Sequence, residues 1–193
     1  MVELSLSRLA DLPLKRWTVG DYHRMLASGI LTPEDRVELL DGQIVEMVPQ
    51  DPPHASRIDD GGDYLKALFA GRAKVRVQLP ITLAPGSEPE PDFAIVRDDE
   101  TRYRTRHPYP EDVLLLIEVA DSTFKRDRGS KSKIYARAEI PEYWIVNFKQ
   151  RQVLAFQNPQ DGDYQTEQTF GNQDRLAPLL MPDVAVDLRQ LIL

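Results

Sequence analysis

Cysteine is absent from the sequence, which excludes disulfides, thiolate metal sites and cysteine nucleophiles. Histidine occurs three times in 193 residues, too rarely for a histidine-rich metal centre. A glycine-rich phosphate loop and a Gly-x-Ser-x-Gly nucleophile elbow are also missing, which argues against P-loop chemistry and this type of serine hydrolysis. No apolar run approaches membrane-spanning length, and no basic segment precedes an apolar one at the N-terminus. We therefore expect a cytoplasmic protein that does not bind membranes.

Length and composition predict one folded domain. A chain of 193 residues can bury about two thirds of the surface that it exposes when unfolded. Hydrophobic residues make up 41% and charged residues 28%, which is usual for a globular protein and unusual for a disordered one. We expect an irregular N-terminal arm over residues 1–16 and a single domain over residues 17–193.

Charge is distributed unevenly along the chain. The formal net charge of −7 opposes binding to nucleic-acid phosphates. Residues 125–137, however, hold six lysine or arginine side chains against one acid, and residues 97–107 mix four arginines with three acids. Either segment could be ordinary solvated surface or a patch that faces phosphate.

The residue pattern predicts a mixture of helices and strands. A helix begins at Thr18 and ends at Gly29, because apolar residues recur at helical spacing between a capping residue and a stop. A β-hairpin turns at Asp41-Gly42, since this dipeptide supplies the positive φ angles of a two-residue turn. The order of elements predicts an α/β or α+β fold with a mixed central sheet. The further expected elements are helices over 54–69 and 127–138, strand structure over 74–83, a strand containing Asp92, strands over 113–119 and 142–147, an antiparallel hairpin of 152–157 with 164–170 whose loop holds Asn158-Pro159 and Asp161-Gly162, and a short helix at the end of 182–193.

The helix expected over 54–69 contains an unfavourable segment, Asp59-Asp60-Gly61-Gly62-Asp63. Each glycine in a helix interior costs about 1 kcal/mol relative to alanine, and three acids stand where a packed helix has aliphatic residues. We therefore expect a kinked or frayed helix here.

Two carboxylates stand on strands that should be buried. Asp92 follows Pro91 at the start of one strand, and Glu118 lies in an apolar run over Val113–Val119 that is typical of a central strand. An unpaired buried carboxylate costs several kcal/mol, so a compensating cation is needed. Oxygen ligands suit Mg²⁺ or Mn²⁺, and the Val119 carbonyl could add a ligand. Glu38 alternates with apolar neighbours in the first hairpin strand and is a third candidate.

A basic helix follows these strands. Asp127, Lys131 and Tyr135 are spaced four apart and should share one face of it. A lysine beside a metal-bound phosphate can orient or deprotonate water and offset charge on phosphorus. Two carboxylates, a metal ion and a lysine are sufficient for phosphodiester hydrolysis.

Structural explanations of the same residues stay open. Asp92 could be a strand-start residue. Glu118 could form a structural ion pair with Arg126 or Lys131. Glu38 read alone is typical of a surface hairpin.

The chain resembles the PD-(D/E)XK nuclease superfamily, most closely the bacterial branch labelled putative restriction endonuclease. The resemblance implies a mixed sheet flanked by helices, a metal held by Asp92 and Glu118 with a contribution from Glu38, and supporting contacts from Gln78. It implies a homodimer as well. The superfamily's lysine position, two residues after the second acid, is Ala120 here, and the lysine of this branch maps to Lys131. The motifs that carry the resemblance are Val-Glu-Leu-Leu-Asp-Gly at 37–42, Pro-His-Ala at 53–55, Val-Gln-Leu-Pro-Ile at 77–81, Glu-Pro-Glu-Pro-Asp at 88–92, Leu-Ile-Glu-Val at 116–119, Asp-x₃-Lys-x₃-Tyr-Ala at 127–136 and Ile-Pro-Glu-Tyr-Trp-Ile-Val at 140–146.

The hypothesis favoured by the sequence is a Mg²⁺-dependent (or Mn²⁺-dependent) endonuclease that acts on DNA, with Asp92, Glu118, Lys131, Glu38 and Gln78 in the site and Val119 as a backbone ligand. A catalytically silent module that keeps the fold for dimerisation or partner binding is the alternative. A phosphodiesterase acting on RNA or small nucleotides is a third option.

Overall fold

The structure is a computed structural model that describes residues 13–120 and 123–192. Most of the arm expected over residues 1–16 lies outside these ranges, so the arm stays a prediction. A 3₁₀ turn precedes each of two strands, at Pro33–Asp35 and Pro110–Asp112, and a π-helical turn covers Asp127–Lys131. The helices are α1 (Val19–Ala27), α2 (Pro52–Leu68), α3 (Phe124–Arg126), α4 (Ser132–Arg137) and α5 (Arg189–Ile192). The strands are β1 (Val37–Leu40), β2 (Gln43–Glu46), β3 (Lys74–Val77), β4 (Phe93–Val96), β5 (Val113–Ala120), β6 (Glu142–Asn147), β7 (Gln152–Gln160), β8 (Asp163–Gly171), β9 (Arg175–Leu176) and β10 (Val186–Asp187).

A mixed sheet forms the centre of the domain. Within the described ranges it has six strands in the order β3-β4-β5-β6-β7-β8. β5 and β6 are parallel, and the other neighbouring strands are antiparallel. The connection from β5 to β6 carries α3 and α4, because a parallel pair needs a crossover. The predicted mixed central sheet is confirmed.

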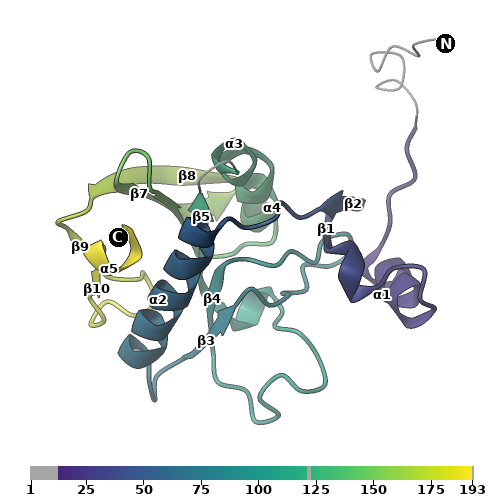
Figure 1. The fold of residues 1–193 in the computed structure, drawn as a ribbon, viewed down its shortest axis with the longest axis horizontal. Coiled ribbons are helices and arrows are strands. Elements are labelled where there is room, and N and C mark those ends of the chain that lie inside the picture. The colour runs from purple at the N-terminus through teal and green to yellow at the C-terminus, as the bar shows by residue number, and fades with distance from the viewer. Residues whose placement is uncertain (1–12, 121–122, 193) are drawn as a thin grey trace.

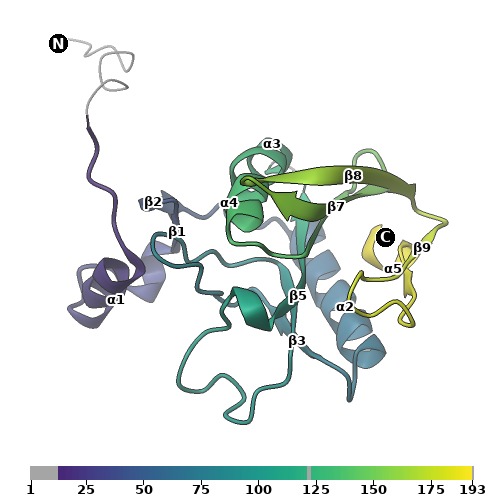
Figure 2. The same ribbon diagram turned by 180° about the vertical axis from the view of Figure 1, so that it is seen from behind.

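Helices cover both faces of the sheet. α2 and α5 pack on one face, where Leu65 and Leu191 join the core, and α4 packs on the other through Ile134. Successive residues of β5 alternate between the two cores, so Ile117 faces α2 and Leu116 faces α4. Figures 1 and 2 show α1 and the β1–β2 hairpin at one end of the molecule and α5 with β9 and β10 at the other. None of the helices in the described part of the chain is long and apolar enough to cross a membrane.

The expected N-terminal helix and hairpin are confirmed. The Thr18 side chain accepts a hydrogen bond from the Asp21 amide at 3.1 Å and caps α1. Asp41 and Gly42 adopt φ angles of 49° and 74°, as a tight turn between two right-twisted strands requires. The pairing of Leu40 with Gln43 closes the β1–β2 ladder at that turn.

The glycines of α2 allow it to approach the sheet closely. The expected kink or fraying is wrong, because α2 runs uninterrupted from Pro52 to Leu68 and is drawn as a straight helix in Figure 1. A Cβ on Gly61 would lie 3.2 Å from Phe93 Cζ, and one on Gly62 would lie 3.2 Å from Val77 Cγ2. The acids of this segment face solvent. Close packing against β3 and β4 therefore offsets the low helix propensity of the glycines.

Replacing Gly62 with leucine is expected to destabilise the domain by roughly 1–3 kcal/mol, because the added side chain overpacks the contact with Val77. Gly129→Ala is the matched control, since a Cβ at Gly129 would meet nothing within 4 Å. That control should leave the free energy of unfolding unchanged or raise it by up to about 1 kcal/mol. Urea unfolding followed by circular dichroism measures both, and equal stability of the two variants would refute the close-packing explanation.

Two of the expected strand boundaries are wrong. The strand structure expected over residues 74–83 stops at Val77, because Gln78 adopts a left-handed φ of 48° and Pro80 has no N–H for a ladder. Asn158-Pro159 lies within β7 and not in the loop, and only Asp161-Gly162 forms the turn between β7 and β8. Local turn propensity at Asn158-Pro159 is overridden by pairing with β8.

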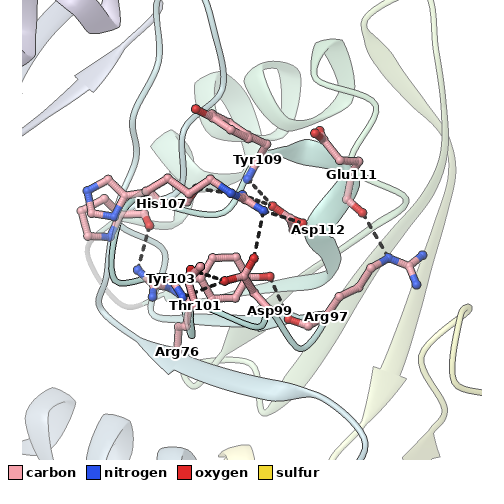
Figure 3. Close-up of polar contacts among 11 residues, drawn as sticks. Arg76, Arg97, Asp99, Thr101, Tyr103, His107, Tyr109, Glu111 and Asp112 are labelled. Atoms are coloured by element: carbon pink, nitrogen blue, oxygen red, sulfur yellow. Dashed lines mark hydrogen bonds and ion pairs between the residues drawn. The ribbon is translucent and has the colours of Figure 1, made fainter.

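The arginine-containing loop between β4 and β5 is internally paired. The Arg106 guanidinium lies 3.4 Å from Asp99, also pairs with Asp112, and packs over the Tyr103 ring at 5.3 Å. Figure 3 labels Asp99, Asp112 and Tyr103 of this loop and shows the hydrogen bond from the Tyr103 hydroxyl to the Arg97 carbonyl. Because the Arg106 charge is already paired, Arg106 is better explained as a structural surface residue than as part of a phosphate-binding patch.

Candidate functional site

Three polar side chains lie in a row across the ends of β3, β4 and β5. Phe93 pairs with Ile117 in the β4–β5 ladder, so continuing this register by one residue places Asp92 opposite Glu118. On the other side, the Gln78 amide donates to the Asp92 carbonyl at 3.1 Å. Directly opposed residues have Cβ atoms about 5 Å apart. The sheet register therefore brings Gln78, Asp92 and Glu118 together.

Asp92 is held in place through both carboxylate oxygens. Gln78 Nε2 donates to Oδ1 at 3.0 Å, and the Val119 amide donates to Oδ2 at 2.8 Å. His54 Nε2, on the first turn of α2, lies 4.0 Å from Oδ1. The N–H and C=O of one strand residue point to the same strand edge, so the Val119 carbonyl faces the same side as Asp92. In the structure, however, it is the Val119 N–H and not the carbonyl that contacts the Asp92 carboxylate.

Glu118 lies at the centre of a buried ion-pair network on the α4 side of the sheet. Its Oε1 accepts from Lys131 Nζ at 2.8 Å and from the Tyr135 hydroxyl at 2.8 Å. Lys131 Nζ also lies 3.4 Å from Glu38 Oε2, which accepts from the Glu90 amide at 3.2 Å. Glu38 is 1% exposed, so its interpretation as a surface hairpin residue is wrong. The alternative Glu118–Lys131 ion pair is present.

Burial makes negative charge unfavourable at this point. Burial raises the pKa of Glu118 above its ordinary value, and the nearby Lys131 ammonium opposes that rise. Burial alone would lower the pKa of Lys131, but Glu118 and Glu38 raise it above the ordinary value, so the ammonium stays charged. Burial also raises the pKa values of Asp127 and Glu90. An added cation would relieve this accumulation of carboxylates.

The segment that carries Lys131 differs from the expected α-helix over 127–138. α3 ends at Arg126, a π-helical turn covers Asp127–Lys131, and α4 begins at Ser132. Such turns are rare and occur frequently at functional sites. Asp127, Lys131 and Tyr135 are all buried, and the shared face predicted for them is turned inward.

The row of polar side chains opens into a cleft of about 130 Å³. Among the described residues that line it, six are acidic and three are permanently cationic, which leaves a formal excess of three negative charges. The cleft is therefore acidic, although the segment that carries Lys131 is rich in basic residues. The acids are Glu38, Asp51, Glu90, Asp92, Glu118 and Asp127, and the cations are Arg36, Arg126 and Lys131.

The donor set fits Mg²⁺ or Mn²⁺. These cations are bound through one or two carboxylates together with waters and substrate oxygens. In residues 13–120 and 123–192, no three histidine, aspartate or glutamate side chains are arranged to hold a metal. Mg²⁺ keeps several waters and needs only one or two carboxylates, so Asp92 and Glu118 stay the proposed side-chain ligands and the Val119 carbonyl the proposed backbone ligand. Asp127 Oδ2 is buried and has no hydrogen-bond partner in the described ranges, which also fits a cation-binding cleft.

Several cleft residues were not among the predicted site residues, including Glu90, His54 and Arg126. Glu90 could have been found, because acids at every second position of Glu88-Pro-Glu90-Pro-Asp92 fall on one face of an extended segment. His54 had no local signal beyond its place near a helix start. Arg126 was considered only as an alternative partner of Glu118.

The sequence model of a family described as "Uma2: Putative restriction endonuclease" matches residues 19–189, which contain the entire cleft. The chain belongs to the Uma2 family. No curated protein matches the sequence. Among solved structures, the crystal structure of a putative nuclease belonging to DUF820 from Anabaena variabilis ATCC 29413 is similar, with a TM-score of 0.70 and 14% identity over 91% of this chain and 97% of that one.

This structural similarity shows the fold. The predicted membership of the PD-(D/E)XK superfamily and the restriction-endonuclease-like fold are confirmed. Family and fold together support a nuclease for this Uma2 protein. The roles of individual residues and the metal stay proposals, because fold alone does not establish chemistry.

Proposed function

We propose that this Uma2-family protein is a divalent-metal-dependent endonuclease that hydrolyses phosphodiester bonds of DNA. The observation that carries the proposal is the position of Asp92, directly before β4, beside Glu118 of β5, where the Val119 amide donates to Asp92 at 2.8 Å and the buried Lys131 ammonium lies 2.8 Å from Glu118. Two carboxylates and a cationic donor in one cleft are the parts that phosphodiester hydrolysis requires. The family resemblance alone supports a homodimer.

Asp92 and Glu118 would hold the metal with the Val119 carbonyl. A bound Mg²⁺ or Mn²⁺ would polarise the phosphate and lower the pKa of a water molecule. Gln78 keeps Asp92 oriented through its 3.0 Å hydrogen bond. These contacts pre-organise the carboxylates, so little reordering is required when the substrate arrives.

Lys131 would act on the reacting phosphate. Glu118 and Glu38 hold its ammonium in one position, at 2.8 Å and 3.4 Å. From there the ammonium can donate to the attacking water or to a phosphate oxygen and offset the charge that develops on phosphorus. Tyr135 restrains Glu118 from the same side.

Nicking of supercoiled plasmid DNA tests the proposal. We expect cleavage with Mg²⁺ or Mn²⁺ and at least a hundredfold loss after chelation, because the metal contributes several kcal/mol of charge stabilisation. Parallel assays with RNA and with small nucleotide diesters separate a deoxyribonuclease from the other phosphodiesterases. Cleavage that persists unchanged in chelator, or that is absent with either metal, would contradict the proposal.

One observation favours a catalytically silent module for dimerisation or partner binding. Asp92 and Glu118 each accept two hydrogen bonds from protein donors without a metal. Such a network can serve as a buried structural element. Titration calorimetry with Mn²⁺ separates the two functions, since the silent module would show no binding and the enzyme would show it.

A further inference from the structure

The wall of the cleft contains a cation with unused hydrogen-bonding capacity. Arg126 lines the cleft, and its Nε is buried without a hydrogen-bond partner among the described residues. The adjacent Asp127 is 1% exposed, and its Oδ2 likewise has no partner in the described ranges. Native proteins satisfy almost all of their buried polar atoms, so the buried Arg126 Nε without a partner in the described ranges indicates a missing acceptor.

The other two cations of the cleft differ from Arg126 in how far their charge is already paired or screened. Lys131 Nζ already lies within 3.4 Å of two carboxylates, Glu118 and Glu38. Arg36 is exposed, where water screens its charge. Arg126 is therefore the cation of the cleft whose buried Nε has no hydrogen-bond partner among the described residues.

We propose that Arg126 binds the scissile phosphate of the substrate strand. This inference rests on the proposed nuclease function and identifies the group that recognises the substrate anion. A phosphodiester that enters the cleft meets a formal excess of three negative charges among the described lining residues. The Arg126 guanidinium, whose Nε has no partner among these residues, offsets this repulsion. Nε and one terminal N–H of arginine form a planar pair of donors that matches two phosphate oxygens.

Arg128 provides a matched control on the same segment. It lies two residues from Arg126, but its guanidinium is exposed and pairs with Glu167 of β8 at 2.9 Å. Removing either arginine changes the net charge of the protein equally. A difference between the two variants therefore reports on position and not on overall charge.

The experiment measures binding of a labelled DNA duplex by fluorescence anisotropy, with Ca²⁺ in place of Mg²⁺, at several salt concentrations. Arg126→Ala should weaken binding about tenfold and reduce the slope of log affinity against log salt by about one, as loss of one phosphate contact requires. Arg126→Lys should keep the wild-type slope and recover only part of the affinity, because lysine lacks the planar donor pair. Arg128→Ala should bind DNA like the wild type.

Thermal unfolding of each variant shows whether it is folded, and the slope separates a phosphate contact from a structural role. Equal affinities and slopes for Arg126→Ala and Arg128→Ala would overturn the inference while leaving the nuclease proposal intact. If Arg126→Ala fails to fold, an Arg126→Lys variant with wild-type affinity would overturn the bidentate contact. A wild-type protein that neither binds nor cleaves DNA would overturn both proposals.

Discussion

Replacing Asp92 with asparagine is expected to reduce metal-dependent DNA cleavage by about a thousandfold. Loss of one anionic ligand removes roughly 4 kcal/mol of transition-state stabilisation, and each 1.36 kcal/mol corresponds to a factor of ten in rate. The fold should persist, because the asparagine side-chain oxygen can still accept the hydrogen bond from the Val119 amide. Cleavage rates at saturating Mg²⁺ and Mn²⁺ affinity from calorimetry measure the effect.

Asp163→Asn is the control for this prediction. Asp163 is an exposed residue of β8, and its carboxylate lies 3.9 Å from the Lys133 ammonium. The control makes the same chemical change on the surface, so its cleavage rate should stay within about twofold of the wild type. Comparable activity of the Asp92 and Asp163 variants would remove Asp92 from the proposed site.

Replacing Lys131 with methionine is expected to destabilise the domain by about 3–5 kcal/mol in the absence of metal. The substitution leaves Glu118 and Glu38 buried without their shared cation, and removing one partner of a buried ion pair is strongly destabilising. In a domain of this size the change corresponds to a fall in Tm of roughly 10 °C. Cleavage should also be lost. It must be measured below the Tm of the variant, because an unfolded protein would be inactive for any reason.

Two further variants isolate the cause. Lys133→Met changes an exposed residue of α4, 3.9 Å from Asp163, and should shift stability by less than about 0.5 kcal/mol. Adding Glu118→Gln to Lys131→Met should recover much of the lost stability, because the amide removes one unpaired charge and can still accept from Tyr135. Urea unfolding provides the comparison. A Lys131 variant as stable as the Lys133 variant would show that the buried network contributes little.

Much of the fold could be predicted because its signals are local. Thr18 and Gly29 mark the ends of α1, and Asp41-Gly42 determines the turn of the first hairpin through backbone φ angles. The apolar run over Val113–Val119 predicted a strand buried on both faces, as β5 is. Glu118 was conspicuous because a charge interrupts that run. These inferences require only neighbouring residues.

Other features depend on contacts between distant segments. The burial of Glu38 follows from the packing of the hairpin beside Lys131, which no periodicity in residues 37–40 reveals. Gly61 and Gly62 have low helix propensity, but they let α2 pack closely against Phe93 of β4 and Val77 of β3. The π-helical turn over Asp127–Lys131 likewise departs from the regular helix that a four-residue spacing predicts. In each case tertiary packing outweighed local propensity.

By itself the sequence determined the elements, the family resemblance and the chemical nature of the candidate residues, since these depend on side-chain type and local periodicity. Only the tertiary structure decided that Asp92 lies opposite Glu118, because the pairing register of two strands is set by the whole sheet. It also decided which cations are already paired. Lys131 is held by carboxylates, whereas Arg126 Nε has no partner in the part of the chain that the structure describes. Burial and distance, and not residue type, determine which charges meet.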